Sequence, residues 1–248
     1  MLKETLLSLR MFGAVEAMES FSRITDKSAY TEALLKAEIS YRDERKNERL
    51  LKSATFPSEK EWGEIDKTLN PEIDFNSVQA LGSGEFVRNK ENLCLVGHQG
   101  TGKSHSLVAL GRELCRKGVS VKFYTAHTLV TILEEAQDDH TLSKITDALL
   151  KPQLLIIDEL GFVPFTKKGA NLLFDVFAKR YEKGSIALST NLTFDKWSSL
   201  FRSTELTAAL LDRFTHKAHI FAYKGQSARF LESKKRQEKH KLMEQKRE

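Results

Sequence analysis

The apolar residues of this chain follow two patterns, and the change falls between residues 57 and 92. Up to residue 55 they recur at helical spacing, and no proline precedes Pro57. This pattern predicts a purely helical segment, with Asp26 or Ser28 capping its second helix. From Asn92 onward, short apolar runs alternate with longer amphipathic stretches.

The alternation predicts an ordered series of strands and helices. Strands are expected over residues 92–96, 119–124, 154–157 and 185–189. Helices are expected over residues 104–117, 126–136, 142–150 and 169–182. Strands separated by helices predict an α/β fold, in which a parallel sheet is covered by helices on both faces.

The composition permits one large domain and gives a weak indication of the partner. The 248 residues are 40% hydrophobic and 29% charged, with a net charge of +5. From Gly225 to the end, eight Lys/Arg stand against four Asp/Glu, so 8 − 4 = +4 of this charge lies in the last segment. Such a tail is either a solvated terminus or a contact with DNA.

A second charged stretch lies in the helical segment, between residues 42 and 52. Its basic residues are Arg42, Arg45, Lys46 and Arg49, interleaved with acidic ones. One interpretation is a solvated face with ion pairs four residues apart. The other is a surface that contacts the DNA backbone or docks a partner.

The two cysteines and the absence of long apolar runs indicate in which cellular compartment the protein is expected. Cys94 and Cys115 belong to no metal-ligand pattern and lie in apolar surroundings, which favours buried thiols in a reducing compartment. No run approaches the eighteen apolar residues of a membrane span, and the first ten residues do not resemble a signal peptide. We therefore expect a cytoplasmic protein without a membrane partner.

A phosphate-binding loop follows the first predicted strand. Residues 97–104 read GHQGTGKS and match GxxxxGK[ST] at each fixed position, between a strand and a helix. Gly97, Gly100, Thr101 and Gly102 would form a cradle of backbone N–H groups for phosphate oxygens. In the segment that follows, Lys103 would reach the β- and γ-phosphates of ATP, Ser104 would bind Mg²⁺, and His105 lies beside them.

Polar residues end two other predicted strands. In LLIIDE, Asp158 and Glu159 follow four apolar residues, and Asn191 closes IALSTN. Asp158 is expected to hold Mg²⁺, and Glu159 to activate the attacking water. A kinase needs no carboxylate for water here, so this pair favours ATP hydrolysis. Asn191 could contact the γ-phosphate or serve only as a turn former.

These segments, together with LLKAEISYRDERKNERLLKSATFP and AALLDRFTHKAH, resemble the IstB-type ATP-binding proteins of bacterial insertion sequences. That family is related to the DnaC helicase loader and the DnaA initiator, all AAA+ ATPases. The resemblance implies a AAA+ P-loop NTPase core, preceded by a small N-terminal helical domain. It also implies an ATPase that forms homo-oligomers on DNA, taken as duplex, and assists a partner transposase.

The resemblance also implies roles that spacing alone does not give. Asn191 would be a sensor of the γ-phosphate, and Arg213 would be an arginine finger that completes the site of a neighbouring subunit. Arg229 would be a second sensor, although the family usually has an aromatic residue where this chain has Ala228. The helices over 126–150 would line a channel for DNA, with Lys144 as a candidate phosphate contact.

We expect a helical domain over residues 1–58, a connector over 59–90, an ATPase domain over 91–231 and a basic tail over 232–248. Two other functions remain open. A loader of the DnaC type would share the fold but use a different partner. A small-molecule kinase with a P-loop would leave Glu159 and Arg213 unexplained.

Overall fold

The fold is built on one five-stranded parallel sheet. The structure, a computed structural model, describes residues 1–225, 227, 228 and 230. The strands are β1 (Asn92–Gly97), β2 (Val121–Thr125), β3 (Leu154–Leu160), β4 (Ser185–Thr190) and β5 (Ala218–Tyr223). Their order in the sheet is β2-β3-β4-β1-β5, and every pairing is parallel. The predicted α/β class is therefore confirmed.

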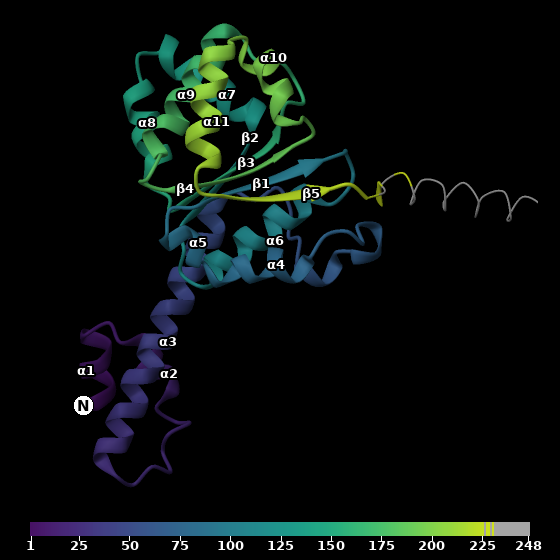
Figure 1. Cartoon of the computed structure of the whole chain (residues 1–248). Coiled ribbons are helices and arrows are strands. Elements are labelled where there is room, and N and C mark those ends of the chain that lie inside the picture. Colours follow the sequence, from purple (N-terminus) through teal and green to yellow (C-terminus); the bar gives the residue numbers. More distant parts are fainter. Residues whose placement is uncertain (226, 229, 231–248) are drawn as a thin grey trace, which may run out of the picture.

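Helices cover both faces of the sheet (Figure 1). One face carries α7 (Ala126–Asp138), α8 (Leu142–Leu150), α9 (Lys167–Arg180), α10 (Trp197–Phe201) and α11 (Thr204–Thr215). The other carries α4 (Phe75–Ala80), α5 (Glu85–Arg88) and α6 (Lys103–Arg116). Because both faces are covered, the central strands β3 and β4 are buried almost throughout, which explains why they read as continuous apolar runs.

An N-terminal arm projects from this core (Figure 1). It consists of α1 (Leu2–Ser8), α2 (Phe12–Ala17) and the long helix α3 (Lys27–Ala54). Asp26, one of the two predicted caps, accepts a hydrogen bond from the Ala29 N–H at 2.7 Å and begins α3. Thr55 ends the helix in a left-handed conformation, with φ at 59°.

Segment 59–90 packs into the core although it reads as a polar connector. It forms the short 3₁₀ helices Trp62–Glu64, Lys67–Leu69 and Leu81–Ser83 besides α4 and α5. Phe75, Val78, Phe86 and Val87 are buried in the same apolar cluster as β1 and α6. This segment therefore forms part of the face of the sheet on which α6 lies.

Two features of the sheet differ from the sequence-based prediction. Strand β5 was not predicted; it pairs only with β1 and is half-exposed, so its apolar pattern is weak. Strand β3 continues to Leu160 rather than ending at residue 157, with an irregular register against β4 between Ile157 and Leu160. Asp158 and Glu159 therefore lie within the strand, at this irregularity.

A further short 3₁₀ helix, Phe194–Lys196, precedes α10. In the part of the chain that the structure describes, no helix combines the length and apolar character needed to cross a membrane. Both cysteines are buried, as expected. Burial raises the pKa of the Cys94 thiol, and it raises that of Cys115 to about 11, so both remain protonated at neutral pH.

Candidate functional site

The phosphate loop joins β1 to α6 at the carboxyl edge of the sheet. Gly100 and Gly102 have φ of 75° and 95°, a region that favours glycine, and α6 begins directly afterwards at Lys103. The Lys103 side chain is 8% exposed, and its ammonium donates to the carbonyls of Gly97 at 2.7 Å and His98 at 2.6 Å. The loop thus holds its lysine at the N-terminus of a helix, where an anion is favoured.

Residues outside the motif hold the loop from its outer side. Asn70, which is 3% exposed, donates to the Thr101 carbonyl at 2.8 Å and accepts from the Gly225 N–H at 2.9 Å. The Ala228 N–H donates to the Gly100 carbonyl at 2.9 Å. Sequence reasoning missed Asn70 because one asparagine in a polar connector carries no recognisable pattern. The side chain ties the connector, the loop and the segment after β5 together.

A cluster of oxygen ligands lies beside the loop. The Ser104 hydroxyl donates to Asp158 Oδ1 at 2.9 Å, and the Ser189 hydroxyl donates to the same oxygen. Asp158 is 5% exposed and has no cationic partner among the described residues. A buried carboxylate without a counter-ion, next to a hydroxyl, suits a hard cation such as Mg²⁺. Ser104 and Asp158 would hold the ion, which would supply positive charge to offset the negative charge of the nucleotide's phosphates.

Glu159 has an unusual backbone. Its φ is 61°, in the left-handed region, and its N–H donates to the Ser189 hydroxyl at 3.0 Å. Its side chain is exposed, whereas that of Asp158 is buried. Strained non-glycine residues concentrate at functional sites. At the irregularity in β3, the Asp158 carboxylate thus lies inside the protein and the Glu159 side chain outside.

Asn191 follows β4 at the same edge of the sheet. It is exposed and lies near Gly161, since a Cβ built on Gly161 would be 3.3 Å from the Asn191 side-chain oxygen. Gly161 comes two residues after Glu159 along the chain. Asn191 and the two carboxylates therefore come from adjacent strands at one edge, as the sequence predicts.

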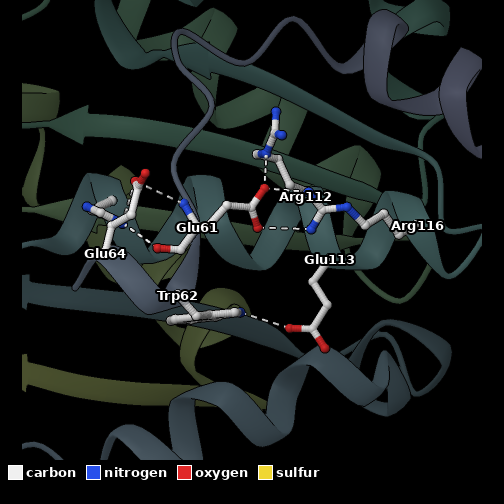
Figure 2. Close-up of polar contacts among 7 residues, drawn as sticks. Glu61, Trp62, Glu64, Arg112, Glu113 and Arg116 are labelled. Atoms are coloured by element: carbon white, nitrogen blue, oxygen red, sulfur yellow. Dashed lines mark hydrogen bonds and ion pairs between the residues drawn. The ribbon is translucent and has the colours of Figure 1, made fainter.

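The connector is bound to α6, the helix that follows the phosphate loop, by hydrogen bonds and ion pairs (Figure 2). The Glu61 carboxylate accepts from Arg112 Nε and from Arg116 Nη1, both at 2.9 Å, and also from Arg116 Nη2. His105 Nε2 donates to the Glu61 carbonyl at 2.8 Å. The His105 ring is thus engaged by the connector, one residue after Ser104.

A second set of hydrogen bonds joins the connector to the C-terminal end of α6. The Trp62 indole donates to Glu113 Oε2 at 2.8 Å, and Lys117 donates to Glu113 Oε1 at 2.7 Å and to the Gly82 carbonyl at 2.7 Å. From the N-terminal arm, the Asn47 amide of α3 donates to the Arg116 carbonyl at 2.7 Å. Helix α6 is therefore fixed between the connector and the N-terminal arm.

Arg213 lies far from the phosphate loop of its own subunit. It is exposed in the last turn of α11, with its guanidinium 5.7 Å from the Phe174 ring centre. The next carbonyl, of Phe214, accepts from Asn92 at the start of β1, at 3.0 Å. The loop follows the other end of β1, about 16 Å away for a strand of this length. Arg213 and the loop thus occupy opposite edges of the sheet.

The candidate DNA contacts lie on two separate elements. Arg42, Arg45, Lys46 and Arg49 are exposed and fall along one face of α3, and the three arginines line a shallow groove together with Arg10. Arg42 also pairs with the buried Glu38 at 2.6 Å. Lys144 is exposed on α8. Arg229 and the tail over residues 232–248 lie outside the described residues.

Comparison with known proteins agrees with this site. Over residues 4–237 the chain matches the family of IstB-like ATP binding proteins. The chain belongs to this family. It is 36% identical over 208 residues to a Geobacillus stearothermophilus protein assigned as the ATP-binding protein of insertion sequence IS5376, covering 84% of this chain and 83% of that protein. The corresponding protein of insertion sequence IS21 from Pseudomonas aeruginosa is 35% identical over 201 residues, which cover 81% of this chain and 76% of that protein.

Solved structures show which fold the IstB-like chain shares. DnaA from Aquifex aeolicus, bound to AMPPCP, superposes with a TM-score of 0.57 at 17% identity, covering 75% of this chain and 56% of DnaA. DnaI superposes with a TM-score of 0.54 at 17% identity, covering 72% of this chain and 92% of DnaI. At these identities the likeness concerns the fold alone, which this chain shares with DnaA and DnaI.

Proposed function

We propose that this IstB-like protein binds and hydrolyses Mg²⁺-ATP in an assembly of identical subunits on DNA, and thereby assists the transposase of its insertion sequence. The relatives are proteins of insertion sequences, which supports transposition as the process. ATP and bacterial DNA share the cytoplasm, so we propose that location too.

Within one subunit, the proposed hydrolytic site has the parts needed to bind nucleotide and water. The loop amides and Lys103 would neutralise the phosphates, and Ser104 and Asp158 would hold Mg²⁺. Glu159 would accept a proton from the attacking water, and Asn191 would orient the γ-phosphate. ATP supplies the phosphoryl group, and water takes it.

The observation that carries the proposal of assembly is the position of Arg213. Because it lies at the amino end of β1, it cannot reach the nucleotide at the carboxyl end of the same strand. An exposed arginine without a carboxylate partner in the described chain is available to another molecule. A head-to-tail neighbour would bring it to the open side of the γ-phosphate, where an arginine finger accelerates transfer about a thousandfold or more.

Mixing two inactive variants tests this arrangement. Lys103→Ala should lose ATP binding, because the loop loses its cation, and Arg213→Ala should bind ATP normally but hydrolyse it at least about a thousandfold more slowly. When the two are mixed, some interfaces would pair an intact loop with an intact finger, so part of the ATPase activity should return. If the variants co-assemble in sedimentation and the mixture stays inactive, Arg213 does not act across a subunit interface.

A further inference from the structure

A pocket lies at the amino edge of the sheet, beside Arg213. Its apolar wall comes from α9 and α11, with Phe174, Phe177 and Phe214 among the lining residues. The turns before β1 and β4 complete it. Its charged lining residues are the four cations Lys90, Arg180, Arg213 and Lys217 and the single carboxylate of Glu182, a net charge of 4 − 1 = +3. A pocket of this charge attracts an anion.

Arg180 places a buried positive charge in the pocket lining. Its side chain is 1% exposed, and it donates to the carbonyls of Leu149 at 2.7 Å, Ser185 at 2.8 Å, Pro152 at 3.0 Å and Gln153 at 3.2 Å. Its Nε has no hydrogen-bond partner, and no carboxylate pairs with it, among the described residues. Burial lowers its pKa to about 10, so the group stays charged at neutral pH. A buried charge without a counter-ion is costly unless an anion comes close.

The cations at the rim are also unpaired. Lys90, Arg213 and Lys217 form no ion pair in the described part of the chain. Lys90 and Glu182 both have left-handed backbones, with φ of 59° and 60°. Each such conformation costs on the order of 1 kcal/mol in a non-glycine residue and is often retained at binding sites. The pocket is therefore enclosed by two strained turns and carries uncompensated charge.

We propose that this pocket receives the terminal phosphates of the nucleotide bound by the next copy of the chain, and that Lys217 acts there beside Arg213. The proposal rests on the proposed function, in which Arg213 already faces that nucleotide. In a head-to-tail assembly the amino edge of one subunit meets the carboxyl edge of the next. The carboxyl edge carries the phosphate loop, so the anion that it would present to the pocket is the terminal phosphate of the bound nucleotide.

Lys217 gives the sharpest test, because it is exposed and can be replaced without opening the core. Lys217→Gln should leave the affinity for ATP unchanged and lower kcat about tenfold, since a fixed charge near the developing oxyanion is lost. Lys217→Arg should keep most of the activity. Lys151→Gln is the matched control: Lys151 is an exposed lysine on the same side of the sheet, before β3, and it does not line the pocket.

The same mixing experiment shows whether Lys217 acts across the interface. In a mixture of the two variants, Lys217→Gln subunits supply the intact phosphate loop and Lys103→Ala subunits supply the intact pocket. The kcat, calculated per Lys217→Gln subunit, should therefore rise above that of Lys217→Gln alone. Lys90→Gln provides a second variant if Lys217→Gln melts at a lower temperature than the wild type.

Three results would overturn the proposal, and together they separate failure of the pocket from failure of the shared site. If Lys217→Gln keeps the wild-type kcat while Arg213→Ala loses ATP hydrolysis, Arg213 acts on the neighbour's nucleotide but the pocket does not receive its phosphates. If both variants are fully active, the shared site itself is wrong. If Lys217→Gln changes only the salt dependence of DNA binding, the phosphate that meets the pocket belongs to DNA.

Discussion

At the scale of single residues, the site is organised by which way two adjacent carboxylates point. Asp158 is directed inward to the hydroxyls of Ser104 and Ser189, while Glu159 is turned to solvent by a left-handed backbone. An unstrained strand would also send consecutive side chains to opposite faces. Here the irregularity in β3 also frees the Glu159 N–H to bond Ser189, which links both carboxylates to one hydroxyl.

The left-handed backbone of Glu159 predicts that substitutions there change the stability of the fold and the rate of ATP hydrolysis independently. Glu159→Gln should bind ATP normally but hydrolyse it at least about a hundredfold more slowly, because the amide cannot accept the proton of the attacking water. Glu159→Gly should be equally inactive, yet more stable than Glu159→Ala by about 1 kcal/mol, because glycine adopts a positive φ without strain. ATPase assays and thermal melting of the three variants would check both parts. Equal stability of the glycine and alanine variants would argue against strain at this position.

At the scale of elements, α6 is held by contacts from two earlier segments of the chain. Glu61 and Trp62 of the connector contact its side chains (Figure 2), and Asn47 of α3 binds the carbonyl of Arg116 at its end. The hydrogen bonds from Arg116, with a further one from Arg112, lower the pKa of the Glu61 carboxyl to about 2. The connector is thereby fixed to the helix that begins with Lys103 and Ser104.

The low pKa of Glu61 predicts how this contact responds to pH. Since the folded pKa lies below the ordinary value of 4.5, the ionised carboxylate stabilises the fold fully above about pH 4.5 and progressively less as the pH falls toward 2. Glu61→Gln should therefore lower the free energy of unfolding at pH 7 by about 1 kcal/mol, a modest figure because the carboxylate is partly exposed. The difference from wild type should shrink at pH 3. Glu59→Gln, an exposed neighbour, is the control, and a deficit that does not depend on pH would contradict the ion-pair explanation.

The sequence predicted those elements whose signals are local. The loop glycines, the strand that begins at Leu154 and the capping Asp26 each carry a pattern within a few residues. Gly100 and Gly102 have positive φ, the strand begins as predicted but runs on to Leu160, and Asp26 is the one of the two candidate caps that begins α3. Strand β5 escaped prediction because an edge strand is covered less completely and its apolar pattern is broken. Asn70 and the Glu61 contacts escaped because they join residues at least 31 positions apart, and one sequence does not show such pairs.

At the scale of the whole molecule, the two edges of the sheet have complementary chemistry. The carboxyl edge carries the phosphate loop, Asp158 and Glu159, whereas the amino edge carries Arg213 and the cationic pocket. Two different surfaces that fit each other produce head-to-tail assembly rather than a twofold dimer. The arm formed by α1, α2 and α3 projects from the core (Figure 1).

The exposed arginines of this arm predict which residues account for the salt dependence of DNA binding. Arg42, Arg45 and Arg49 lie along one face of α3, and their spacing of three to four residues lets several guanidinium groups follow one phosphate backbone. Each neutralised phosphate contributes about −0.9 to the slope of log K against log salt concentration. Arg45→Gln and Arg49→Gln together should therefore make the slope shallower by up to about 1.8. They should weaken binding similarly for different sequences, since phosphate contacts carry no sequence information.

Lys36→Gln is the control, because Lys36 lies on the same helix but pairs with Glu32 at 2.6 Å. Fluorescence anisotropy with a labelled duplex at four or five salt concentrations gives the slopes, and an unchanged slope in the double variant would show that this face of α3 is only solvated.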